Sequence, residues 1–116
     1  MLRVLAGIIA GTIGGIIVVG LVERAGDALY PPPQVPMTTL AVELIGWAFG
    51  SFVAGALGAR IAQRGPIPGL VAGAFLLFAG IVTLIEIPHP FWMIVGGAAA
   101  LTLPALIASL LFERRA

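Results

Sequence analysis

The sequence predicts an all-α protein, an antiparallel bundle of four transmembrane helices with both termini in the cytoplasm. Four apolar runs, residues 4–22, 38–59, 67–85 and 91–112, each have about the length that a helix needs to cross a bilayer. The 116 residues are 60% hydrophobic and 9% charged, whereas soluble domains carry about 25% charged residues. Five of the six basic residues fall at the ends of the runs that would share one side of the membrane.

These basic residues orient the predicted bundle. Arg3, the connection 60–64 and the C-terminal residues 114–115 carry the five arginines, and the two connections on the other side carry only Arg24. By the positive-inside rule, both termini are cytoplasmic. We therefore expect a multi-pass protein of the bacterial cytoplasmic membrane, with the lipid bilayer as its first partner.

The expected elements form one domain over residues 1–116. The first helix, about 3–25, has an apolar run longer than the core of about 7–15 residues in a secretory signal, so we expect it to be retained. The extracytoplasmic loop, about 26–37, is rich in proline and should be an extended strap. Helices at about 38–63, 67–86 and 90–113 follow, and the short connections between them predict antiparallel neighbours. Pro104 should kink the last helix.

Small residues recur at every fourth position, which predicts close helix packing, because lipid supplies no hydrophobic drive between helices. The positions that carry this prediction on the first two helices are Gly7, Gly11, Gly15, Gly46, Gly50, Ala54 and Gly58. Packing within one chain explains these rows. One row could also form a dimer face, since the rows offer more groove than one bundle needs.

Glu43 is the best sequence candidate for a partly buried ionisable group. It lies inside the start of the second helix, whose positive N-terminus suits a carboxylate. Trp47 and the row with Gly46 and Gly50 lie on adjoining faces by helical spacing. Ionisable residues within a membrane are functional candidates by default.

Other candidates gather at the extracytoplasmic end. Glu23 and Glu86 lie at the predicted C-terminal ends of helices, where the helix dipole disfavours negative charge. His89 lies between two prolines in the last connection, and Trp92 follows as an aromatic anchor at the border. With Tyr30 of the loop, these residues and Glu43 and Trp47 form the predicted ligand or partner site.

Several segments resemble a family of small bacterial four-helix integral membrane proteins that has no assigned function. These segments are 22–23, 28–32 with its Tyr-Pro-Pro string, 46–55, 59–62 and 87–92 with its Pro-His-Pro-x-Trp motif. The resemblance implies the four-helix membrane fold, and it supports Glu23, Tyr30 and His89 as candidate functional residues. The first loop is shorter here than in that family, and the stretch 96–98 lacks an acid that some members carry.

We expect a non-enzymatic helix-packing module, either a homo-oligomer or an accessory subunit of a membrane complex. A small dimeric transporter that uses Glu43 is the alternative, and a membrane enzyme or cofactor site around His89 is a third. The chain has no cysteine, which excludes disulfides and cysteine metal sites. Its net charge of +1, without a basic tract, gives no sign of a nucleic-acid partner. One histidine among scattered acids predicts no metal site, and no cofactor is expected.

Overall fold

A computed structural model describes residues 2–29, 37–86 and 91–113 of the chain. It contains four α-helices: α1 (Leu2–Leu29), α2 (Met37–Ala62), α3 (Ile67–Glu86) and α4 (Phe91–Leu111). The all-α fold with four helices is therefore confirmed. The predicted loop 30–36, with Tyr30, and the connection 87–90, with His89, lie outside the described residues.

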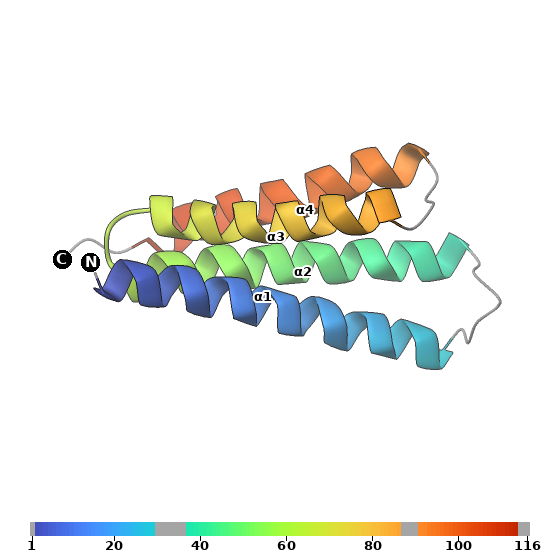
Figure 1. The fold of residues 1–116 in the computed structure, drawn as a ribbon, viewed down its shortest axis with the longest axis horizontal. Coiled ribbons are helices and arrows are strands. Elements are labelled where there is room, and N and C mark those ends of the chain that lie inside the picture. The colour runs from blue at the N-terminus through green and yellow to red at the C-terminus, as the bar shows by residue number, and fades with distance from the viewer. Residues whose placement is uncertain (1, 30–36, 87–90, 114–116) are drawn as a thin grey trace.

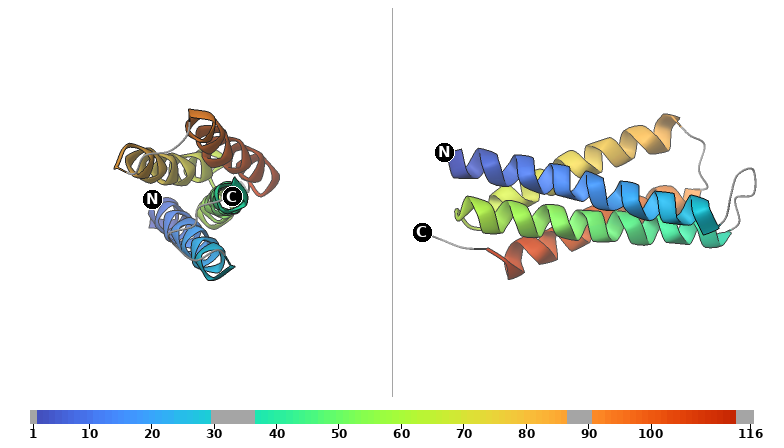
Figure 2. Two further views of the ribbon diagram at one scale, coloured as in Figure 1. Left: turned by 90° about the vertical axis from the view of Figure 1, so that its right-hand side faces the viewer. Right: turned by 90° about the horizontal axis from the view of Figure 1, so that it is seen from below.

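The four helices lie side by side along the long axis of a bundle measuring 49 × 25 × 22 Å (Figure 1). The start of α1, the end of α4 and the α2–α3 connection lie at one end of this axis, which we call the terminal end; the opposite end is the distal end. α2 contacts each of the other three helices. In the described residues α1 and α4 make no contact, and the end view in Figure 2 shows them on different sides of α2.

α1 continues beyond its predicted end. The sequence placed the start of the first loop at residue 26, but the helix runs on to Leu29. Glu23 therefore lies more than one turn inside α1. Its charge is then less exposed to the helix dipole than predicted, because that effect falls off within the last turn.

The connection between α2 and α3 forms a compact cap. Gln63 takes a φ of 53° just after the end of α2, and its N–H donates to the carbonyl of Ala59 at 3.3 Å. Gly65 has a φ of 75°, which a glycine adopts without strain. Arg3 Nε donates to the carbonyl of Ile61 at 3.2 Å, so the start of α1 helps to satisfy the end of α2.

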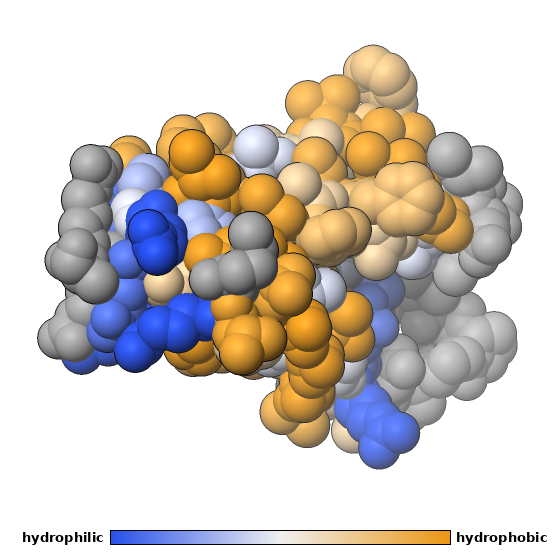
Figure 3. Space-filling view, turned by 60° about the vertical axis from the view of Figure 1, so that its left-hand side comes forward, coloured by the Kyte–Doolittle hydropathy of each residue, from blue (hydrophilic) through white to orange (hydrophobic). Residues whose placement is uncertain are grey.

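The core is built mainly from small side chains, and large apolar side chains cover the outside. Buried alanines line the helix interfaces, joined by Trp47, Leu76, Met93 and Leu101. In contrast, Ile9 on α1 is 56% exposed, Phe49 on α2 60% and Phe78 on α3 68%. On the face shown in Figure 3, hydrophilic residues gather at the terminal end and hydrophobic residues cover the middle. A water-soluble fold would bury such side chains instead.

Glycines of α1 face the backbone of α2 in the terminal half. A Cβ on Gly7 would lie 2.6 Å from the carbonyl oxygen of Gly58, and one on Gly11 would lie 2.5 Å from that of Ala54. A Cβ on Gly15 would lie 2.8 Å from the carbonyl oxygen of Gly50. These glycine rows are therefore filled by contacts within one chain.

Ser51 joins α2 to α4 beside Pro104. Its hydroxyl donates to the carbonyl of Leu101 at 2.8 Å and accepts from the N–H of Ala105 at 3.0 Å. Leu101 and Ala105 would ordinarily bond to each other as an i, i+4 pair of the helix. A fully buried hydroxyl therefore bridges α4 next to its proline, a link that the sequence analysis did not foresee.

Three of the described helical segments are long and apolar enough to cross a membrane. They are Leu2–Ala25, Ala41–Ala62 and Phe91–Leu111. The described apolar segment of α3, Ile67–Thr83, is shorter.

Candidate functional site

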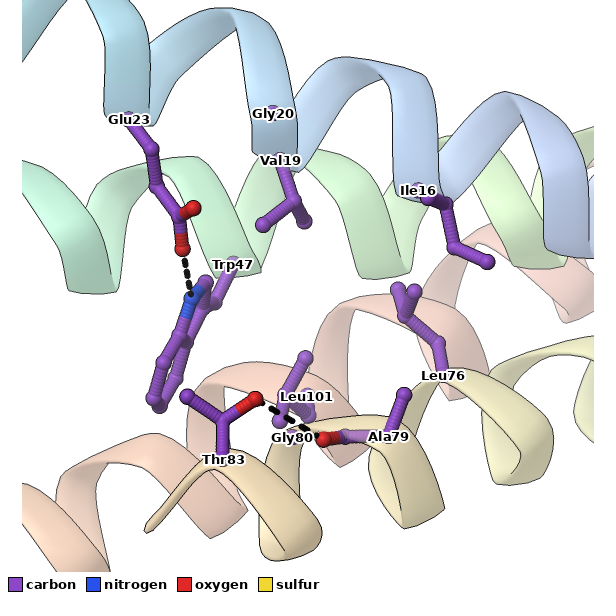
Figure 4. A pocket seen from close by; sticks show the side chains of 10 residues that line it. All are labelled: Ile16, Val19, Gly20, Glu23, Trp47, Leu76, Ala79, Gly80, Thr83 and Leu101. Carbon is purple, nitrogen blue, oxygen red and sulfur yellow. Dashed lines mark hydrogen bonds between the residues drawn. The ribbon is translucent and has the colours of Figure 1, made fainter. Parts of the chain in front are cut away.

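A cavity of about 220 Å³ lies in the distal half of the bundle, where side chains from all four helices meet (Figure 4). Ile16 on α1 and Ala79 on α3 lie exposed on its two sides, so the cavity opens sideways between these helices. Its described lining consists of Ile16, Val19, Gly20, Glu23, Trp47, Leu76, Ala79, Gly80, Thr83 and Leu101.

The cavity lies on a side of α1 that is turned away from its close contacts with α2. Those contacts continue into the distal half, where a Cβ on Gly50 would lie 2.5 Å from the side chain of Val19. A Cβ on Gly15 would still lie 3.1 Å from the side chains of Ala54 and Leu76. A Cβ on Gly20 would meet no atom within 4 Å. The same residue type is thus packed in one part of α1 and faces open space a little further along. On α3, Ala79 and Gly80 add little side-chain volume, which keeps the space free.

Glu23 and Trp47 form the polar end of the cavity. The indole Nε1–H of Trp47 donates to Oε1 of Glu23 at 3.4 Å, a long hydrogen bond. Trp47 is only 3% exposed and packs in the core with Met93 and Leu101, whereas Glu23 is half-buried. A buried indole N–H usually finds an acceptor, and here α1 supplies it.

Gly46 explains how α1 comes close enough for this bond. A Cβ at Gly46 would lie 2.7 Å from the side chain of Val22, the residue before Glu23. The glycine thus lets α1 approach α2 one residue away from the tryptophan. A larger residue at position 46 would push the carboxylate away from the indole.

Thr83 is the other polar group of the lining. Its hydroxyl donates to the carbonyl of Ala79 at 3.1 Å, within its own helix, and Figure 4 shows this bond across the cavity from Glu23. Among the described lining residues, Glu23 is the only one with a titratable side chain. The arrangement offers a carboxylate at one end of a largely apolar space.

The structure brings together Glu23 and Trp47 from the predicted site. The sequence analysis had paired Trp47 with Glu43, but the indole N–H bonds to Glu23. Glu43 is half-buried and is not among the described residues that line the cavity. Trp92 is 40% exposed near the start of α4, also away from the lining.

The other predicted residues lie outside this description. Glu86 is the last residue of α3, and nothing can be said of its side chain. Tyr30 and His89 lie outside the described residues. Gly20 and Thr83 were not foreseen as lining residues, because nothing in a single helix shows which neighbours it will lose.

A second hollow has a different character. It lies on the surface of α2 beside Pro104 of α4, has a volume of about 360 Å³, and is lined by Ile45, Ala48, Phe49, Phe52 and Pro104. It contains no polar side chain among these residues. In the described part of the chain, no three His, Cys, Asp or Glu residues come together as a group that could hold a metal ion.

Comparisons with family models, curated proteins and solved structures found no match to this chain. The resemblance to a family of small four-helix membrane proteins therefore stays a prediction.

Proposed function

We propose that this chain is an integral protein of a bacterial cytoplasmic membrane, crossing it four times as an antiparallel bundle with both termini inside. The exposed apolar side chains on α1, α2 and α3 support a lipid environment. α3 has 20 residues, about 30 Å at 1.5 Å per residue, which suffices for the fourth span. The arginines at the terminal end support its cytoplasmic position.

Its function, in this proposal, is to bind a small, largely apolar molecule that enters the distal cavity from the lipid. The observation that carries the proposal is a preformed space of about 220 Å³, open between α1 and α3, with one carboxylate at its end. Ligand sites are typically apolar with a few placed polar groups. The protein would act as a non-enzymatic membrane module, consistent with the lack of a titratable partner for Glu23 in the described lining.

A homo-oligomer or a membrane-protein partner belongs to this proposal as well. The glycine rows no longer argue for it, because Gly7, Gly11 and Gly15 are filled by α2 of the same chain. A measured mass in mild detergent decides the matter: one chain per particle and no co-purified protein would remove this part of the proposal.

Topology is tested with single cysteines, since the natural chain contains none. In intact cells a membrane-impermeant maleimide should label Gln34→Cys, and should label Arg64→Cys only after the membrane is permeabilised. The reverse pattern would overturn the proposed orientation.

Binding is tested with Trp47 as a reporter. The chain has two tryptophans, so Trp92→Phe leaves Trp47 as the sole indole. The probe is para-bromo-neopentylbenzene, a neutral apolar molecule whose bromine quenches an indole on contact. Saturable quenching in dodecyl maltoside that Gly20→Leu removes would support the proposal. Quenching without saturation, or unchanged by Gly20→Leu, would overturn it.

A small transporter is the second candidate, and the open cavity with its carboxylate favours it. This version differs from the sequence prediction, because the carboxylate in the cavity is Glu23 and not Glu43. Uptake of an organic cation into proteoliposomes that is lost in Glu23→Gln and kept in Glu43→Gln would support transport. Absence of uptake by the natural chain would leave the binding module.

A further inference from the structure

We infer that the cavity takes a molecule with a cationic head and a short apolar body, such as an apolar amine or quaternary ammonium compound. The head would lie at Glu23 beside Trp47, and the body would extend toward Ile16. This inference rests on the proposed binding function and adds the charge and the orientation of the ligand.

The charge argument starts from Glu23. Its carboxylate is half-buried, and in the described part of the chain its one polar contact is the Trp47 N–H, which occupies Oε1. No cationic side chain of the described residues pairs with it. Arg24 follows directly in the sequence and is exposed. A cation in the cavity would be attracted to this carboxylate, and a half-buried charge is screened less than an exposed one.

The indole strengthens the preference for a cation. Trp47 lines the cavity next to the carboxylate (Figure 4), and tryptophan is the best aromatic partner for a cation near its ring. Since core residues hold the ring and the hydrogen bond holds the carboxylate, both groups are preorganised. Little side-chain freedom is then lost on binding.

The position of the pair along α1 sets the orientation. Glu23 directly follows the apolar run 4–22, so in the proposed topology it lies at the membrane border. Ile16 lies about 10 Å deeper along the helix axis, at 1.5 Å per residue. The cavity walls between them are apolar: Val19, Gly20, Leu76, Ala79 and Gly80. The head would thus stay near water while the body enters the hydrocarbon.

The volume of the cavity limits the size of the ligand's apolar body. The volume of about 220 Å³ lies below the range of about 300–1,000 Å³ of drug-sized sites. A single aromatic ring or a short chain fits this space, and a bulky multi-ring cation does not. A two-chain lipid could place only part of itself there.

The test compares two probes that differ in charge and hardly in shape. Para-bromobenzyltrimethylammonium is the cation, and para-bromo-neopentylbenzene replaces its nitrogen by carbon. Both are titrated against the Trp92→Phe protein in dodecyl maltoside, an uncharged detergent, with quenching of Trp47 as the readout. The unfolding midpoint serves as a second readout of the same binding. We expect the cation to bind about tenfold more tightly than its neutral isostere.

Two matched Glu→Gln variants test whether the preference for the cation arises at Glu23. Glu23→Gln keeps an oxygen that can accept the indole hydrogen bond and removes the charge, so the preference for the cation should become clearly smaller, with only the contribution of the Trp47 ring left. Glu43→Gln removes another half-buried charge that does not line the cavity and should keep the tenfold preference. Ala99→Leu, on an exposed position of α4, controls for the leucine in Gly20→Leu.

The outcomes separate the two proposals. If the Trp92→Phe protein binds both probes equally and Gly20→Leu blocks this binding, the cation inference is overturned and the binding function stands. Saturable binding of neither probe would overturn both. A preference for the cation that is as large in Glu23→Gln as in the protein with Glu23 would also overturn the inference.

A final arm identifies the source of the cation. An ammonium group occurs both on free amphipathic amines and on the headgroup of phosphatidylethanolamine. Micelles doped with phosphatidylethanolamine should weaken probe binding relative to undoped micelles if the lipid headgroup occupies the site. Unchanged probe binding would exclude the lipid headgroup as the occupant and leave a free amine as the proposed ligand.

Discussion

Gly11 and Gly20 lie on the same helix, yet they lie in regions that differ in packing. At Gly11 a single added carbon would lie 2.5 Å from the backbone oxygen of Ala54 and 3.0 Å from the side chain of Ala72. At Gly20 the same carbon would meet nothing within 4 Å. Close contacts with the backbone of α2 thus run along the side of α1 that carries Gly11, and the side that carries Gly20 borders the cavity. The comparison teaches that a glycine can close an interface or leave one open, depending on the neighbouring helix.

The largest expected effect comes from placing the same side chain in both regions. Gly11→Leu should lower the free energy of unfolding by about 3 kcal/mol, because the rigid backbone of α2 cannot move aside easily. Gly20→Leu should change it by less than about 1 kcal/mol, in the stabilising direction, since leucine favours a helix and the space is free. Unfolding in mixed micelles of dodecyl maltoside and dodecyl sulfate measures both. Equal losses in the two variants would contradict the contrast.

Ser51→Ala tests the link between α2 and the cavity floor at Leu101. The variant loses two buried hydrogen bonds to α4, and we expect a loss of about 1–2 kcal/mol, because interhelical bonds in membrane proteins reach about 1.7 kcal/mol each. Ser109→Ala is the control, since that hydroxyl donates to Ala105 of its own helix. A larger loss for Ser109→Ala than for Ser51→Ala would mean that the bridge does not hold α4.

Trp47→Phe tests the hydrogen bond at the polar end of the cavity. Phenylalanine keeps most of the buried ring and loses the donor to Glu23, so we expect a loss of about 1 kcal/mol, the value of one typical hydrogen bond. In the double variant with Glu23→Leu, which removes the acceptor, the two effects should fail to add, because both changes remove the same bond. Additive losses would indicate that the two side chains do not interact.

Glu23→Gln should have the smallest effect on stability, less than about 0.5 kcal/mol. The amide oxygen can still accept from Trp47, and Glu23 lies far enough from Leu29 to escape most of the helix dipole. The same unfolding measurement applies. A loss above about 1 kcal/mol would give the charge a structural role and would weaken its assignment to a ligand.

The sequence predicted an all-α fold with four helices, because apolar runs of helical length can be recognised from local composition. It also identified Glu23 and Trp47 as candidates. It could not pair them, since they lie 24 residues apart and their contact depends on how α1 is rotated against α2. Helical spacing relates only residues of the same helix, so it favoured Glu43 as the neighbour of Trp47. The cavity could not be predicted from the sequence for the same reason, because Gly20 and Gly11 are the same residue type and differ only in the residues around them.

The central claim, an open cavity between α1 and α3 in the distal half, is tested most directly by lipid contact with Trp47. In the Trp92→Phe protein, reconstituted with phospholipids brominated along their acyl chains, a buried indole in a closed bundle would be shielded from quenching. We predict strong quenching, because the cavity opens to the lipid, and we predict that Gly20→Leu removes most of it while Ala99→Leu does not. Weak quenching of Trp47 that is unchanged by Gly20→Leu would contradict the account.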